Sequence, residues 1–154
     1  MKHMWSEEEI LSQKKDISTL VDSKGNPRFI EGEGTPATIE GFTATYCKWS
    51  LSGSHLMIVF AGILASGFIL EWDTNLRADF KDIPSFILDK TAVLFQNYVD
   101  KKIVSIFGEA GTEATTRWVL SKEANKFVVR ATSGGTLTEA KNFRVQFDLL
   151  IDTE

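Results

Sequence analysis

An alternation of apolar and polar residues near the end of the chain is the feature that most constrains its fold. Apolar side chains occupy every second position over this segment: Phe143, Val145, Phe147, Leu149 and Ile151. Polar side chains lie between them at Arg144, Gln146 and Asp148. Successive residues of a β-strand point to opposite faces of the sheet. The pattern therefore predicts a strand with one face in a core and the other in solvent.

A predicted hairpin in the middle of the chain adds two more strands. The runs Phe42–Leu51 and His55–Leu64 flank the turn Ser52–Gly53–Ser54, and a glycine in a short loop between apolar runs is typical of a β-hairpin. The segment Leu56–Ile63 has almost no polar residue. We therefore expect both faces of this strand to be covered, either inside a sandwich or by a partner chain.

Turn-forming residues divide the remaining chain into short segments. We expect strands near residues 28–31, 68–72, 91–99, 102–107, 115–121 and 126–132, and turns at Gly32 and Gly34. A helical turn is expected near 84–90, with Asp82 as its cap. Many short strands with little helix after residue 21 predict an all-β fold, an antiparallel β-sandwich or jelly-roll-like domain preceded by a short N-terminal helix. Trp49 and Trp118 are expected in the core or at subunit contacts.

The first residues favour a helix. Ser6 followed by Glu9 fits a capping box, in which both side chains bond free amides of the first turn. Apolar residues recur at Ile10, Ile17 and Leu20. Two interpretations remain open, a helix packed on its own domain and the end of an oligomeric stalk. The predicted division is a leader that resembles a cloning junction at 1–5, a helical segment at 6–22 and a β-domain at 23–154.

Composition excludes several classes of protein. The length of 154 residues suits one domain. Its 17 basic residues are scattered among 21 acidic ones, whereas nucleic-acid binding needs clustered lysine and arginine to displace counterions from phosphates. The longest apolar run, Leu56–Leu70, has 15 residues, and a membrane-spanning helix needs about 20. Acidic residues at 7–9 stand where a secretory signal would be basic. We expect a soluble protein that is cytoplasmic when expressed.

The sequence supplies few residues for catalysis. His55 is the one histidine outside the leader, and Cys47 is the one cysteine. The expected hairpin register separates the two by about four residues at ~3.4 Å each, beyond hydrogen-bond reach. No histidine, cysteine or acidic cluster has the spacing of metal ligands. We therefore predict no catalytic residue, no metal and no cofactor.

One segment is a candidate binding loop: Glu71, Trp72, Asp73 and Asn75. An aromatic ring among carboxylates and amides suits a sugar, whose C–H faces stack on the ring while its hydroxyls bond the polar groups. The alternative is that Trp72 caps the end of the sandwich and its neighbours shape a turn. Two other functions remain open, a β-barrel carrier of a small molecule or lipid and a hydrolase of surface polymer that uses Glu71 or Asp73.

Three stretches together resemble a known group of proteins: Val21–Phe29 (VDSKGNPRF), Lys48–Leu56 (KWSLSGSHL) and Asn142–Asp152 (NFRVQFDLLID). From about residue 21 to 152 the chain is similar to C-terminal domains of tail or baseplate proteins from phages and prophages of Gram-positive bacteria. The resemblance implies a virion structural or receptor-binding module, a homotrimer whose β heads present loops to bacterial cell-surface carbohydrate. It also implies that residues 6–22 are the remnant of a coiled-coil stalk, with Ile10, Ile17 and Leu20 at the subunit interface.

Overall fold

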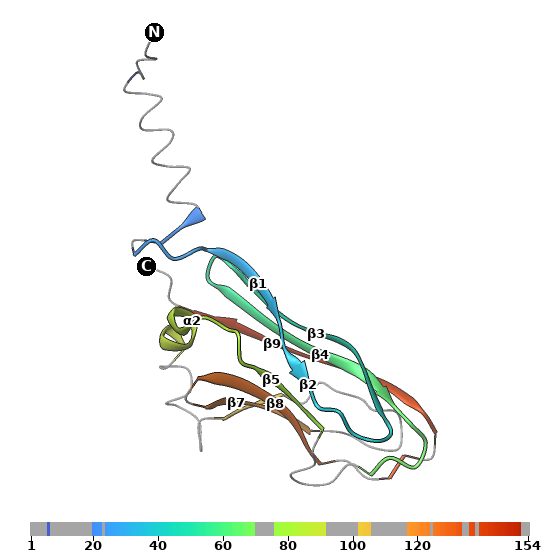
Figure 1. Ribbon diagram of the computed structural model, residues 1–154. Coiled ribbons are helices and arrows are strands. Elements are labelled where there is room, and N and C mark those ends of the chain that lie inside the picture. Colours follow the sequence, from blue (N-terminus) through green and yellow to red (C-terminus); the bar gives the residue numbers. More distant parts are fainter. Residues whose placement is uncertain are drawn as a thin grey trace.

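The computed structural model (Figure 1) describes residues 6, 20–22, 24–69, 76–91, 102–105, 117–123, 125–133, 136–137 and 139–151. Within these ranges the chain is mostly β-strand, and its strands form two antiparallel sheets. The elements in chain order are β1 (Phe29–Glu33), β2 (Thr35–Pro36), β3 (Phe42–Ser52), β4 (His55–Leu64), β5 (Arg77–Phe80), α2 (Ser85–Lys90), β6 (Lys102–Ser105), β7 (Arg117–Glu123), β8 (Lys126–Ser133) and β9 (Lys141–Leu150). The prediction of a mostly β protein is confirmed.

Strands that follow one another in the chain are divided between the two sheets. The first sheet has the order β1-β3-β4-β9 and the second the order β2-β5-β8-β7-β6. Strand β4 pairs with β9 in the first sheet, and β5 pairs with β8 in the second. The chain therefore enters the second sheet briefly with β2, returns to the first for β3 and β4, forms β5 to β8 in the second and ends with β9 in the first. Figure 1 shows the two sheets as two layers.

The core lies between the facing sides of the two sheets. Trp118 of β7 stacks on Phe143 of β9 with their ring centroids 4.8 Å apart, and Phe60 of β4 meets both rings edge-on at 5.8 and 5.2 Å. Aromatic pairs in such geometries add about 0.5–1.5 kcal/mol each beyond the area they bury. The two contacts made by Trp118 join the sheets, since β7 belongs to the second sheet and β4 and β9 to the first. Trp49 and Trp118 are 3% and 0% exposed within this core, which confirms the core interpretation of both residues.

The expected hairpins and the last strand are confirmed. Strands β3 and β4 pair across a tight turn in which Gly53 has φ +62°, a left-handed conformation that glycine adopts without strain. Strands β7 and β8 form the second hairpin around Asn125. In β9, burial alternates from Phe143 to Leu149 as the sequence pattern predicts.

The inner face of β4 is covered as expected, but its outer face is covered only in the middle of the strand, since Ile63 is 41% exposed. Phe60 points into the core, whereas Val59 lies on the outer face of the first sheet, and both are fully buried. The neighbours of Val59 across the two adjoining strands are Lys48 and Gln146. Long polar side chains cover apolar surface with their methylene groups, so side chains of the same chain suffice to bury this position.

The interpretation of Gly32 as a turn is wrong. The strand expected at 28–31 extends to Glu33, and β2 follows within the expected loop. A Cβ on Gly32 would lie 2.6 Å from the Trp49 indole nitrogen, and one on Gly34 would lie 2.7 Å from the Cys47 sulfur. Glycine is needed here because core side chains pack directly against the backbone.

Two further expectations differ from the structure. Strand β5 lies where none was predicted, and its four residues alternate between half-buried and buried. Helix α2 confirms the helical turn near 84–90, but its N-cap position is Pro84 and no side chain caps it. Pro84 occupies the N-cap position itself, with an extended backbone (φ −62°, ψ 146°), so it lies just before the first turn and Asp82 lies two residues before the cap.

Several expectations fall outside the described residues. These are most of the N-terminal helix at 6–22 and of the strand at 91–99. Within the strand expected at 68–72, Ile69 forms an isolated bridge with Thr136. The N-terminal helix and its role as a stalk stay predictions.

Candidate functional site

The predicted binding loop lies outside the described residues, and so do its four candidate side chains: Glu71, Trp72, Asp73 and Asn75. A sugar site at this loop stays a prediction. Of the predicted interface residues, Leu20 is described and its side chain is 59% exposed, while Ile10 and Ile17 lie outside the described ranges.

A polar turn that contains Asp22 and residues 24–26 contributes Lys24 and Asn26 to one wall of a pocket that the structure does describe. Asp22 Oδ1 accepts hydrogen bonds from the backbone amides of Lys24 and Asn26 at 2.9 and 2.8 Å. Asp22 Oδ2 accepts a third from Asn26 Nδ2 at 3.2 Å. Aspartate side chains commonly form such bonds with the amides that follow them. The Asp22 carboxylate therefore holds the shape of this turn.

An ion pair ties the turn to helix α2. Lys90 Nζ donates to Asp22 Oδ2 at 2.8 Å, and the two side chains are 20% and 5% exposed. The hydrogen bond from Lys90 lowers the pKa of Asp22 far below its usual value and outweighs the opposing effect of burial, with further lowering from the bonds of Asn26 and Lys24. Asp22 is therefore a carboxylate at neutral pH, and the pair fixes the turn against the helix.

The pocket between turn and helix, termed the α2 pocket, has a volume of about 360 Å³ and is lined by Lys24, Asn26, Ser85, Phe86, Asp89 and Lys90. Phe86 is half-buried against the core, and Lys90 Nζ lies 5.7 Å from the centre of its ring. Residues three and four apart in a helix are neighbours on its surface, which explains why Phe86, Asp89 and Lys90 reach one pocket. The lining combines an aromatic ring with hydroxyl, amide, carboxylate and ammonium groups.

The sequence-based expectations do not include the α2 pocket. Two local sequence signals indicate the two walls of the pocket separately. The aspartate before Lys24–Asn26 indicates the turn, and the four-residue spacing of Phe86 and Lys90 indicates one face of the helix. Neither signal predicts that the turn and the helix meet, because the ion pair joins residues 68 positions apart.

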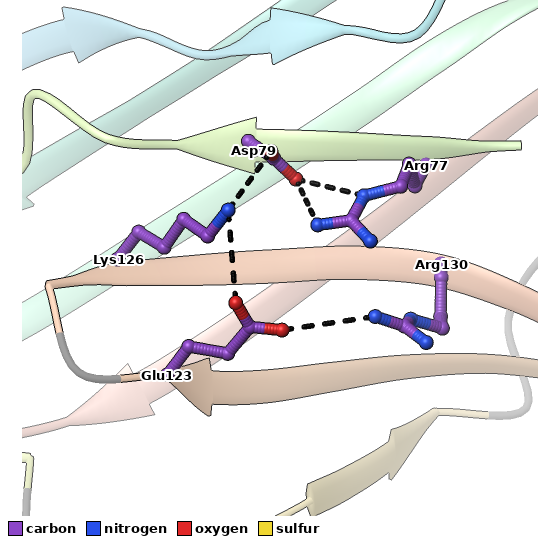
Figure 2. Close-up of polar contacts among 5 residues, drawn as sticks. All are labelled: Arg77, Asp79, Glu123, Lys126 and Arg130. Carbon is purple, nitrogen blue, oxygen red and sulfur yellow. Dashed lines mark hydrogen bonds and ion pairs between the residues drawn. The ribbon is translucent and has the colours of Figure 1, made fainter. Parts of the chain in front are cut away.

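A second group of polar side chains lies on the outer face of the second sheet (Figure 2). Arg77 donates to Asp79 through two nitrogens at 2.9 and 2.7 Å. Lys126 lies 3.1 Å from Asp79 and 3.6 Å from Glu123, and Arg130 lies 3.8 Å from Glu123. Partial burial alone would raise the pKa of Asp79, but hydrogen bonds from Arg77 and Lys126 outweigh it and lower that pKa. Both carboxylates of this cluster are paired with basic side chains, which fits a structural role.

A hollow of about 410 Å³ opens beside this cluster and is lined by Lys81, Glu123, Asn125 and Lys126. Glu123 and Lys126 already belong to ion pairs. Its described lining also has no aromatic side chain. The hollow therefore offers less to a small organic ligand than the α2 pocket does.

His55 lies on the outer face of the first sheet, away from Cys47. Its Nε2 is 2.7 Å from Asp148 Oδ1, and both side chains are about half exposed. His55 is opposite Ser52, whereas Cys47 is opposite Phe60, which confirms the predicted separation. Burial raises the pKa of the Cys47 thiol to about 11. The hydrogen-bond partner that the structure gives His55 is the Asp148 carboxylate.

The described ranges contain no group of three or more histidine, cysteine or acidic side chains placed to hold a metal ion. In the same part of the chain, no helix has both the length and the apolar character needed to cross a membrane. Comparisons with known proteins found no matching family model, no matching curated protein and no matching solved structure.

Proposed function

We propose that the chain is a non-enzymatic structural or receptor-binding module of the phage-tail type, and that it recognises cell-surface carbohydrate through the α2 pocket. The resemblance in sequence supports the class of protein. The pocket supports the ligand, and it is the observation on which the carbohydrate proposal rests. Its volume of about 360 Å³ lies at the lower end of the usual range for small-molecule sites, which suits a ligand of one or two sugar units.

The chemistry of the lining favours a neutral, hydroxyl-bearing ligand. The ring of Phe86 offers an apolar surface to the C–H groups of a sugar. The charge of Lys90 is balanced by Asp22, and Lys24 and Asp89 contribute one charge of each sign. A phosphate or other strong anion would meet no excess of positive charge here. Sugar hydroxyls, which both donate and accept, can pair with every polar group of the pocket.

We propose that the two sheets form a β-sandwich of the jelly-roll-like type. In a jelly roll, two stretches of chain run side by side through both sheets. Here the stretches are β4–β5 and β8–β9, since β4 pairs with β9 in the first sheet and β5 pairs with β8 in the second. These pairings support the assignment. A closed barrel would need one continuous sheet, whereas the described strands form two. Aromatic side chains fill the space between them, which disfavours a lipid or small-molecule carrier.

A glycan array of bacterial cell-surface mono- and oligosaccharides, probed with the purified chain, tests the carbohydrate site. We expect Asp89→Ala and Phe86→Ala to lose binding, because they remove a hydrogen-bonding group and the stacking surface. Asp82→Ala is the matched control, an exposed aspartate outside the pocket. Thermal melting separates loss of binding from loss of fold. Binding that survives Asp89→Ala and Phe86→Ala but is lost in Trp72→Ala would transfer the site to the loop at 71–75.

The stalk is proposed separately, as the segment that joins copies into a homotrimer on a virion tail. Charged residues at Ile10 and Ile17 would disrupt an apolar seam between helices. We expect Ile10→Asp combined with Ile17→Asp to lower the mass measured by light scattering. An unchanged mass would contradict the stalk and leave the carbohydrate site unaffected.

A further inference from the structure

Four strands form the edges of the two sheets: β1, β9, β2 and β6. An open edge presents unpaired backbone groups to other chains, and proteins usually protect it with short strands, proline or repulsive charges. Strand β2 has two residues, one of them Pro36, and β6 has four residues. Strand β1 has five residues, with exposed Glu31 and Glu33 on its outer face. Three of the four edges are therefore protected.

Strand β9 has none of these protections. It spans ten residues, from Lys141 to Leu150, and contains no proline. It pairs with β4 over its whole length without a register shift. Among the described residues, no strand pairs with its other edge. A long, regular edge of this kind is suited to receive a further strand.

The outer face of β9 carries a charge pattern that is complementary to itself. Arg144, Gln146 and Asp148 occupy successive outer positions. Arg144 Nη2 donates to Gln146 Oε1 at 2.9 Å, and Gln146 Nε2 donates to the Asp148 carboxylate at 3.0 and 3.1 Å. The row thus runs from positive through neutral to negative. Reversing the direction of the strand about Gln146 exchanges the positive end with the negative end.

We propose that β9 is an interaction surface for a second copy of this chain. Two copies pair antiparallel and edge to edge, with Gln146 opposite Gln146, and the two four-stranded sheets become one continuous sheet. This contact is isologous, with a two-fold axis through Gln146. Arg144 of each copy lies opposite Asp148 of the other, so each contact contains two ion pairs. The proposal does not depend on the carbohydrate site.

The charges select this register over its neighbours. Side chains opposite each other in an antiparallel pair share one face, so allowed registers differ by two residues. A shift of two residues places Gln146 opposite Arg144 or Asp148 and loses the ion pairs. A shift of four places Arg144 opposite Arg144, or Asp148 opposite Asp148, and like charges directly opposite are destabilising. On the inner face, the proposed register places Phe143 opposite Leu149, which continues the apolar layer.

Light scattering on the full chain tests the pairing through single charge reversals. In Arg144→Asp both pairs become acid against acid, and in Asp148→Arg both become base against base. We expect each variant to have a lower mass than the wild type, because the edge-to-edge contact between copies is lost. Lys48→Asp, on the central strand β3 of the same face, is the matched control and should keep the wild-type mass.

A mixture of the two variants gives the decisive measurement. An acidic edge of Arg144→Asp meets a basic edge of Asp148→Arg, and both ion pairs form again, so the mixture should regain the wild-type mass. The double exchange, Arg144→Asp with Asp148→Arg, should regain it alone. Circular dichroism confirms that each variant is folded. A wild-type mass unchanged by either single reversal overturns the proposal, and so does a mixture that forms no heavier species.

Discussion

Trp118 of β7 stacks on Phe143 of β9, with ring centroids 4.8 Å apart and 25° between the ring planes. Because β7 and β9 belong to different sheets, this contact bears directly on how the layers hold together. We predict that Trp118→Ala lowers the free energy of unfolding by about 3–5 kcal/mol, as expected for truncating a buried aromatic side chain. Denaturant unfolding followed by circular dichroism measures it. Leu150→Ala, at a side chain that is 74% exposed, is the control and should change stability by less than about 0.5 kcal/mol.

The ion pair between Asp22 and Lys90 predicts a specific dependence on pH. The pKa of Asp22 is lower in the folded protein than its ordinary value of 3.8, so folding favours the carboxylate. The stabilisation is fully present above pH 3.8 and is lost as the pH falls through the lower, folded-state pKa. We predict that Lys90→Met weakens this loss on acidification and also lowers stability at neutral pH. Lys24→Met, at the same pocket but outside the ion pair, should keep the wild-type pH profile. Equal profiles in Lys90→Met and the wild type would contradict the role of Lys90.

Cys47 is predicted to be unreactive in the folded protein. Burial raises its pKa to about 11, so only ~0.1% of the thiol is ionised at about pH 8, and the thiolate is the reactive form. A thiol reagent such as iodoacetamide should label the unfolded chain quickly and the folded chain slowly, as followed by mass spectrometry. Equal labelling rates in the two states would show that the thiol does not face the core.

Gly32 should not tolerate a side chain. A Cβ at this position would lie 2.6 Å from the Trp49 indole nitrogen, so the strand or the ring must move. We predict that Gly32→Ala costs about 1–3 kcal/mol of unfolding free energy, in the range for overpacking. Gly53 provides the contrast, since nothing lies within 4 Å of a Cβ built there. Gly53→Asn should be nearly neutral, because asparagine tolerates the left-handed conformation. Thermal melts of both variants and the wild type measure the difference.

The sequence predicts those parts of the fold that rest on local patterns. The alternation in β9 and the two apolar runs around Gly53 indicate their strands because side-chain period and turn chemistry are local properties. Strand β5 has four residues, in which the outward charges Arg77 and Asp79 alternate with the buried Ala78 and Phe80. Two apolar residues alternating with two charged ones are too short a pattern to predict a strand, and β5 is recognised only from its pairing with β8.

The two candidate sites differ in how far the sequence predicts them. The aromatic and acidic loop at residues 71–75 is recognisable in the sequence because its residues are adjacent. The α2 pocket is not, because a partly buried ion pair brings together a turn and a helix that are far apart in the chain. The same holds for Val59, whose outer-face burial depends on strands that adjoin β4 in space.

During synthesis on the ribosome, the first sheet cannot be completed until β9 has been made, because β9 pairs with β4. Strand β4 ends at Leu64 and β9 begins at Lys141, and β5–β8 lie between them in the chain. Phe60 therefore leaves the ribosome well before Phe143, the ring that it packs against. Long-range strand pairing of this kind forms slowly and leaves apolar strands exposed meanwhile. The nascent hairpin β3–β4 therefore exposes one edge and its apolar inner face until β9 has been synthesised and pairs with β4.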